Sequence, residues 1–355
     1  MDDETKARRA RCTDSLMGNG LLRPAELLAS ISPDAEPDVY GEGGAVTALE
    51  DHIAELLGKP AAVFLPSGTM AQAAMLRVHA DRRTTRTVLW HPSCHLATHE
   101  GGAYARLHHL VGRTVGEPDR LISLGDLERV AEPVAALLLE LPQRDLGGQI
   151  PPWDELGAQT SWARERGAAV HLDGARLWEA TAGYERSAAE IAALFDTVYV
   201  SFYKGVGALP GCCLAGSAQD VAEVREWRHR LGGTLFALWP AASSAMALLP
   251  ATLAEMPARM DHTAAIVAAL ADLPTVRAVP DPPHTPMVHL LLSTTADAYA
   301  AAARRLADES AFWVWPRAAA TADPDVVRVE LSVGRATMRH KPSFVAETLQ
   351  ALTVR

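Results

Sequence analysis

The sequence is poor in lysine. Only four of its 33 basic residues are lysines, namely Lys6, Lys59, Lys204 and Lys341, and the other 29 are arginines. A ligand that must form a covalent imine with a side-chain amine therefore has few places to attach.

Long basic runs and long apolar runs are also missing. No Lys/Arg-rich stretch stands out beyond residues 6–11, and the net charge is −10 at pH 7. Binding to nucleic acid needs a basic surface that neutralises phosphates, so we expect no nucleic-acid partner. No apolar stretch approaches the ~20 residues of a membrane-spanning helix, so we expect no membrane association.

Cysteine is scarce, and its placement does not suggest disulfides. Two of the four cysteines, Cys212 and Cys213, are adjacent inside an apolar run; the others are Cys12 and Cys94. The first ten residues are charged throughout and do not resemble a signal peptide. We therefore expect a cytoplasmic protein with reduced cysteines.

Short apolar runs alternate with helix-like segments over much of the chain. This alternation is typical of a mostly parallel sheet covered by helices. The predicted strands are 61–65, 87–90, 134–141, 168–172, 197–202 and 212–215, and the predicted helices include 70–79, 152–166, 188–194 and 220–231.

The pattern divides the chain into three parts. Residues 1–35 form a polar arm without a clear period, and residues 36–250 form a large α/β domain. Residues 251–355 form a smaller α+β domain, with predicted strands at 287–292, 312–315 and 326–333. Two helices, 241–253 and 262–273, are expected on either side of Pro257, because proline disrupts a helix.

Two charged residues follow predicted strands of the large domain. Lys204 comes after the strand 197–202, and Asp173 ends the strand at 168–172. A lysine there can form an imine or reach solvent, and the aspartate can face a protonated ring nitrogen or cap the next helix. Ligands bind at this edge of open α/β sheets.

A third feature follows the strand 61–65. Pro66-Ser67-Gly68-Thr69 opens the next helix, where backbone N–H groups and hydroxyls can hold an anion. An ordinary N-cap is the alternative reading of this stretch. The three features, each after a different strand, are more specific together than singly.

The chain resembles the threonine aldolase/β-eliminating lyase family of pyridoxal-phosphate (PLP) enzymes. Four stretches carry the resemblance: Asp38-Val-Tyr-Gly-Glu42, Pro66-Ser-Gly-Thr-Met70, His171-Leu-Asp-Gly-Ala-Arg-Leu177 and Lys204-Gly-Val-Gly-Ala208. The resemblance implies the aspartate-aminotransferase fold, known as PLP fold type I. That fold has a large domain with a mostly parallel sheet of the seven-stranded type and a smaller C-terminal domain.

The resemblance also implies roles for the residues at matching positions. Lys204 would carry PLP, Asp173 would face its pyridine nitrogen, and His95 would stack on its ring. The phosphate would lie on Ser67, Gly68 and Thr69. The substrate carboxylate would bind Arg176, whose guanidinium could also reach a phosphate, together with Arg328 and Thr13. Tyr40 lies where a partner subunit usually helps to complete the site, which implies a homodimer or homotetramer.

The sequence departs from the family at three positions. Gln143 replaces a histidine and cannot exchange protons as a base. Tyr203 precedes the lysine where serine is usual, and Phe236 stands near where a phosphate-binding arginine is expected. These changes affect the proton pathway and the substrate rather than the cofactor.

A metal site is not expected, although His91, His95 and His99 have helical spacing. Pro92 and Ser93 favour a helix that begins after His91 rather than one that runs through it. The three rings would then not share one helix face.

The predicted reaction is cleavage of the Cα–Cβ bond of a β-hydroxy-α-amino acid to glycine and an aldehyde. The alternatives are a PLP-dependent β-elimination and a non-catalytic PLP-binding protein, which the retained lysine disfavours. Because Gln143 is no base, proton removal would fall to a water, the phosphate or a nearby histidine such as His95 or His99. We therefore expect threonine to be a poor substrate compared with a bulkier β-hydroxy amino acid. The alternative is that Gln143 orients a water and threonine reacts normally.

Overall fold

The structure is a computed structural model that describes residues 1–353. It contains two compact units, each considered on its own below. One comprises residues 24–145 and 150–253, and the other comprises residues 1–23, 146–149 and 254–353.

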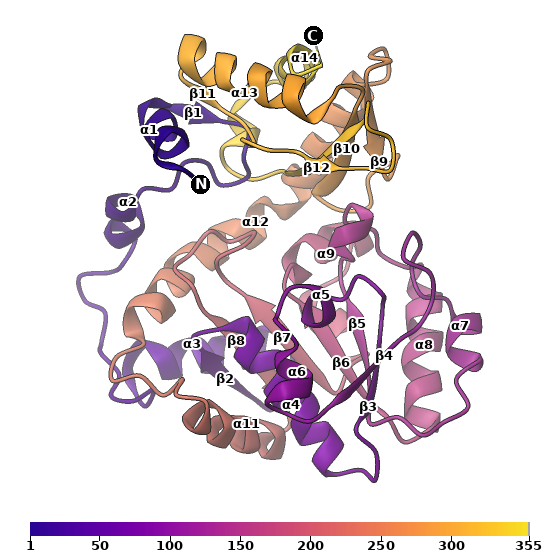
Figure 1. The fold of residues 1–355 in the computed structure, drawn as a ribbon. Helices are drawn as coiled ribbons and strands as arrows, with labels where there is room; N and C mark the ends of the chain where they lie inside the picture. The colour runs from indigo at the N-terminus through magenta and orange to yellow at the C-terminus, as the bar shows by residue number, and fades with distance from the viewer. Residues whose placement is uncertain (354–355) are drawn as a thin grey trace. The chain divides into compact units, whose positions relative to one another are not determined.

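The first unit is built on a seven-stranded sheet in the order β2-β8-β7-β6-β5-β3-β4 (Figure 1). Strand β8 runs antiparallel to both neighbours, and the pairs from β7 to β4 are parallel. The mostly parallel sheet predicted from the sequence is therefore confirmed. The strands are β2 (Ala61–Leu65), β3 (Thr87–Trp90), β4 (Val111–Thr114), β5 (Ala136–Glu140), β6 (Ala169–Gly174), β7 (Thr197–Ser201) and β8 (Cys212–Gly216).

Helices flank this sheet. Helix α4 packs against α11 and against β7 and β8, while α8 packs against β5 and β6. The helices of the unit are α2 (Pro24–Ala29), α3 (Gly44–Leu56), α4 (Gly68–Asp81), α5 (His95–Thr98), α6 (Ala103–Arg106), α7 (Leu124–Glu128), α8 (Trp153–Glu165), α9 (Leu177–Tyr184), α10 (Ala188–Ala192) and α11 (Ala218–Arg230); a 3-10 turn spans Arg144–Leu146.

The strand register sets up a row of side chains at the carboxyl edge of the sheet. Glu140 on β5 is paired with Asp173 on β6, and Asp173 is paired with Tyr199 on β7. Paired residues on neighbouring strands point to the same face of a sheet. The register alone therefore places two carboxyl groups and a phenol side by side.

The second unit has its own core. A four-stranded antiparallel sheet in the order β12-β13-β10-β9 packs with apolar residues of α13 and α14, including Tyr299, Val345 and Leu349. The elements are α1 (Asp3–Arg11), β1 (Asp14–Ser15), β9 (Val276–Val279), β10 (Met287–Leu292), α13 (Ala296–Ser310), β11 (Phe312–Trp313), β12 (Ala319–Ala320), β13 (Val327–Ser332), a 3-10 turn at Thr337–Arg339 and α14 (Pro342–Ala351).

The N-terminal residues are more ordered than the predicted polar arm. Helix α1 begins after Asp2, whose carboxylate accepts from the Thr5 N–H, and Arg8 pairs with Asp308 of α13. Strand β1 pairs in parallel with β11. These contacts join residues 1–23 to residues about 300 positions later in the sequence. A pattern of neighbouring residues cannot predict contacts over that separation.

The predicted break near Pro257 is wrong. A single helix, α12 (Trp239–Ala269), contains Pro250 and Pro257 in its interior. Proline costs a helix one hydrogen bond, but buried side chains along α12, such as Leu249, Met256 and Ile266, offset that cost through packing. No helix within residues 1–353 is long and apolar enough to cross a membrane.

Candidate active site

Lys204 lies just beyond β7 and is held by a well-bonded turn. The Ser201 hydroxyl donates to the Ala175 carbonyl at 2.8 Å, and the Ala208 N–H donates to the Phe202 carbonyl at 2.8 Å. Lys204 is half-buried, with its ammonium 5.8 Å from the centre of the Tyr203 ring. The backbone on both sides of the lysine is therefore fixed to the sheet.

Asp173 is the most buried of the predicted site residues, at 1% exposure. Its Oδ1 accepts from the Ala175 N–H at 3.1 Å, and its Oδ2 accepts from the Gln72 side-chain amide at 2.6 Å. Two N–H donors stabilise a buried carboxylate in its charged form. Asp173 is thus suited to pair with a cationic ring nitrogen.

The anion cradle opens helix α4. Ser67 is the extended N-cap residue, and the first turn carries no acidic side chain. A Cβ at Gly68 would overlap the Tyr199 hydroxyl, so only glycine allows the helix to approach β7 this closely. The N–H groups of the first turn of a helix attract phosphate.

These features meet in one cavity of about 200 Å³. The structure brings together six predicted residues in its lining: Ser67, Gly68, Thr69, His95, Asp173 and Lys204. The lining also includes Gln72, Glu100, Tyr199, Tyr203 and Pro210. A phosphate cradle, a carboxylate and an amine in one cavity match the three polar ends of PLP, so the residues present fit this cofactor.

His95 is the first residue of α5 and is tied to Glu100. Its Nδ1 lies 3.0 Å from Glu100 Oε1, and its ring is 5.0 Å from that of His99. A carboxylate only accepts hydrogen bonds, so Nδ1 carries the proton and Nε2 is left as an acceptor. The sequence pattern did not reveal the role of Glu100.

Four predicted site residues do not line this cavity within residues 1–353. Arg176 belongs to the same unit and pairs with Glu179 at 3.4 Å. Tyr40 is 55% exposed, and its ring meets Phe236 at 5.4 Å. Thr13 and Arg328 belong to the other unit, with Arg328 on β13. The substrate-binding roles of all four residues remain predictions.

Gln143, at the position of the family histidine, is 3% exposed and hydrogen-bonded. Its amide donates to Glu140 Oε2 and to the Ser93 hydroxyl, each at 3.2 Å. Burial and the nearby Asp173 raise the pKa of Glu140 well above its usual value. Gln143 therefore holds the carboxyl group of Glu140 and offers no base.

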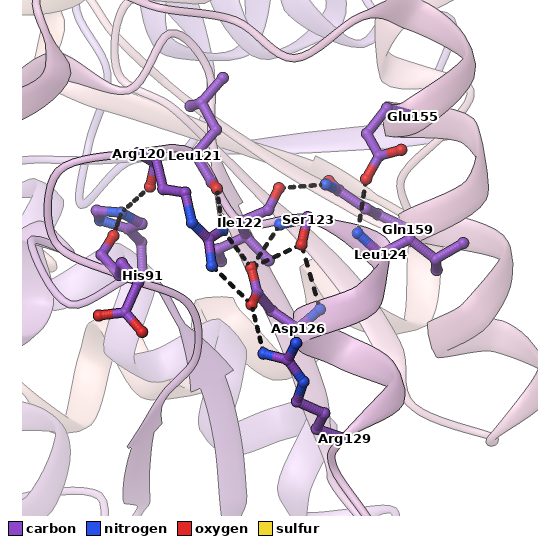
Figure 2. Close-up of polar contacts among 11 residues, drawn as sticks. His91, Arg120, Leu121, Ile122, Ser123, Leu124, Asp126, Arg129, Glu155 and Gln159 are labelled. Atoms are coloured by element: carbon purple, nitrogen blue, oxygen red, sulfur yellow. Dashed lines mark hydrogen bonds and ion pairs between the residues drawn. The ribbon is translucent and has the colours of Figure 1, made fainter.

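Gln143 lines a small cavity of about 20 Å³. His91, Ile122 and Gln159 also line this cavity. Figure 2 shows how its wall is fixed: the Gln159 amide donates to the Ile122 carbonyl at 2.6 Å, and Asp126 binds Arg120 and Ser123. His91 Nε2 meets the carbonyls of Glu117 and Arg120, so this ring is occupied structurally.

The predicted start of a helix after His91 is confirmed. His91 precedes α5, which begins at His95, and His99 is its C-cap residue. No group of three or more His, Cys, Asp or Glu side chains suited to a metal ion occurs among residues 1–353.

The sheet and the cavity at its carboxyl edge define a PLP-dependent enzyme of fold type I. The chain belongs to the beta-eliminating lyase family, whose model matches residues 29–294.

Solved structures and curated proteins agree with this assignment. A Listeria monocytogenes protein, whose crystal structure is assigned to an L-allo-threonine aldolase, has a TM-score of 0.91 and 36% identity and covers 98% of both chains. Aldolase vrtJ of Penicillium aethiopicum is 36% identical over 225 residues, which are 60% of this chain and 57% of that protein. The low specificity L-threonine aldolase of Escherichia coli (strain K12) is 30% identical over 226 residues, 61% of this chain and 67% of that protein.

Proposed function

We propose that the protein is a PLP-dependent lyase that cleaves the Cα–Cβ bond of a β-hydroxy-α-amino acid and releases glycine and an aldehyde. The observation that carries the proposal is the cavity in which Lys204, Asp173 and the cradle at Gly68 and Thr69 converge. The similarity to the aldolases of Penicillium aethiopicum and Escherichia coli, and to the Listeria monocytogenes protein, supports this reaction over others on the same cofactor.

Most of the predicted site residues have a proposed task. PLP, when bound, supplies an electron sink for the bond that breaks. Lys204 holds the cofactor through its amine, and Asp173 keeps the ring nitrogen protonated. Ser67, Gly68 and Thr69 bind the phosphate, while Arg176, Arg328 and Thr13 bind the substrate carboxylate.

The proton of the β-hydroxyl needs an acceptor other than Gln143. We assign this task to His95, because its Nδ1 is held by Glu100 and its Nε2 is open as an acceptor. A well-placed base contributes ~10²–10⁴-fold to a rate.

We further propose that the enzyme is a cytoplasmic homodimer or homotetramer whose subunits complete one another's sites. The exposed pair Tyr40 and Phe236 supports a subunit contact, since large exposed apolar side chains often mark interfaces. The four cysteines, all buried and unpaired with one another, support a reducing compartment.

Product analysis tests the proposed reaction. The holoenzyme is incubated with a panel of β-hydroxy amino acids, and glycine, aldehyde, keto acid and ammonia are quantified. We expect glycine and aldehyde in equal amounts, and neither from Lys204→Ala. Keto acid with ammonia and no glycine would replace the aldolase by a β-eliminating lyase, and no product from any substrate would contradict both.

A further inference from the structure

One buried glutamine links the two ends of the proposed cofactor site. Gln72 lies on α4, three residues after Thr69 of the cradle, and is 2% exposed. Its side-chain amide donates to Asp173 Oδ2 at 2.6 Å. The helix that presents the phosphate cradle therefore also holds the carboxylate that would face the ring nitrogen.

The other side of Gln72 meets a second motif residue. Gln72 Oε1 lies 3.1 Å from His171 Nε2, two residues before Asp173 on β6. His171 Nδ1 lies 2.8 Å from the Thr197 hydroxyl, and that hydroxyl lies 2.8 Å from His79 Nε2. The chain of contacts thus runs from His79 to Asp173 through Thr197, His171 and Gln72.

The chemistry of the two ends fixes the direction of every hydrogen bond. Because a carboxylate only accepts, the amide NH₂ of Gln72 must face Asp173 and its carbonyl must face His171. His171 Nε2 must then donate, which leaves Nδ1 to accept from the Thr197 hydroxyl. Thr197 in turn accepts from His79 Nε2. Each group donates toward Asp173.

Burial supports this directionality. His79, His171 and Thr197 are 3%, 0% and 0% exposed. Burial lowers the pKa of His79 to about 4 and that of His171 to about 3, so both rings are neutral near pH 7. If His171 were protonated, the Thr197 hydroxyl would face two N–H donors, those of His171 and His79. The hydroxyl proton of Thr197 would then have no acceptor among these residues.

We propose that Gln72 is a positioning residue that aims the Asp173 carboxylate at the cofactor ring nitrogen, and that His171, Thr197 and His79 fix the orientation of the Gln72 amide. The inference rests on the proposed PLP site and not on which bond is cleaved, so it applies to an aldolase and to a β-eliminating lyase alike.

The direct readout is the protonation of the ring nitrogen. Holoenzyme is prepared with ¹⁵N-labelled PLP, and the ¹⁵N chemical shift is followed against pH for the wild type and for Gln72→Met, which keeps the size but removes both polar atoms. Loss of a hydrogen bond to a charged group disfavours that charged form by about ten- to a hundredfold. Gln72→Met leaves the Asp173 carboxylate less stabilised, so the proton between Asp173 and the ring nitrogen shifts toward Asp173. We expect the fraction of protonated ring nitrogen in Gln72→Met to be lower than in the wild type over the whole pH range, and kcat to fall with little change in KM.

Two further variants make the result specific. Gln72→Leu also removes both polar atoms but has a different shape, so the same loss of protonated ring nitrogen is expected if Gln72→Met does not fold. Thr197→Val is the matched control. It removes the hydrogen bond between Thr197 and His171 but leaves the Gln72–Asp173 bond, so we expect a smaller change in the ¹⁵N chemical shift than in Gln72→Met.

The failures of the two proposals are distinguishable. Asp173→Asn should leave the ring nitrogen unprotonated. If it does so while both Gln72 variants behave like the wild type, the role of Gln72 is overturned and the cofactor site stands. If Asp173→Asn also behaves like the wild type, the Asp173 assignment itself fails, and the inference with it.

Discussion

At the scale of single residues, the predicted substrate preference rests first on Gln143. Its amide is used by Glu140 and Ser93, and the side chain is buried. Tyr203 lines the cofactor cavity and is 41% exposed, whereas Phe236 is not among the lining residues over 1–353 and instead contacts Tyr40. The expected preference for a bulkier substrate therefore depends on Tyr203 more than on Phe236.

Substrate kinetics test this preference. We expect kcat/KM to be lower for threonine and allo-threonine than for phenylserine, because no histidine stands at position 143. Gln143→His should raise the threonine value, by up to ~10² if the imidazole acts as a base. Efficient turnover of threonine by the wild type, with phenylserine inert, would refute the specialisation but not the lyase.

Asp173→Asn tests the acid at the cavity floor. An amide cannot hold a ring proton as a carboxylate does, so we expect PLP to remain bound while kcat falls about ten- to a hundredfold, the strength of a charge-assisted bond. Absorbance of the bound cofactor measures occupancy and steady-state assays measure kcat. A rate within a few-fold of the wild type would remove Asp173 from this role.

At the scale of elements, the sequence predicted the strands around the site and the helices α4, α8, α10 and α11 to within two residues, but not α12. The strands from β2 to β8 that bear the site lie within two residues of their predicted ends, because apolar runs bounded by polar residues are a local signal. Strand β4 was missed, since its side chains are only partly buried and show no such run. Helix α12 was divided in two, since its prolines outweighed a packing energy that no local pattern encodes.

The same limit applies to the site. Lys204, Asp173 and Ser67–Thr69 stand in recognisable motifs, whereas Gln72, Glu100 and Tyr199 do not. Gln72 reaches Asp173 across 101 residues of sequence, and only the packing of α4 on the sheet brings them together. Its position four residues after Gly68, on the buried side of a helix, was the one available hint.

Two buried histidines, His79 on α4 and His171 on β6, should make the stability of the protein depend on pH. His79 and His171 are neutral in the folded protein, with pKa values lowered to about 4 and about 3. Below pH 6.5 the unfolded chain gains protons on these residues that the folded protein does not, so each ring costs ~1.4 kcal/mol of unfolding free energy per pH unit as pH falls.

Denaturant unfolding of a variant against the wild type isolates this effect from opposing contributions such as that of Glu140. As the pH falls from 6.5 to about 4, the unfolding free energy of His79→Gln minus that of the wild type should rise by ~1.4 kcal/mol per pH unit. Parallel curves for His79→Gln and the wild type would show that His79 is not held neutral.

At the scale of the whole molecule, Arg328 belongs to the C-terminal unit and is predicted to bind the substrate carboxylate. Arg328→Ala should raise KM about ten- to a hundredfold, through loss of a charge-assisted bond to the substrate carboxylate, with PLP affinity unchanged. Arg277→Ala is a matched control, since Arg277 and Arg328 flank Leu291 on neighbouring strands of one sheet. Equal losses of substrate and PLP affinity would contradict the assignment.

The central claim is that the cavity at the end of β7 is a PLP site in which Lys204 bears the cofactor. Borohydride reduction of the native holoenzyme, followed by peptide mass mapping, tests it most directly. Lys59 is the informative competitor: it is partly buried, its ammonium donates to the Phe195 carbonyl at 2.6 Å, and burial lowers its pKa. The account predicts one cofactor adduct per chain, on Lys204, and none after Lys204→Ala. An adduct on Lys59 or Lys341, or none on Lys204 of the holoenzyme, would contradict it.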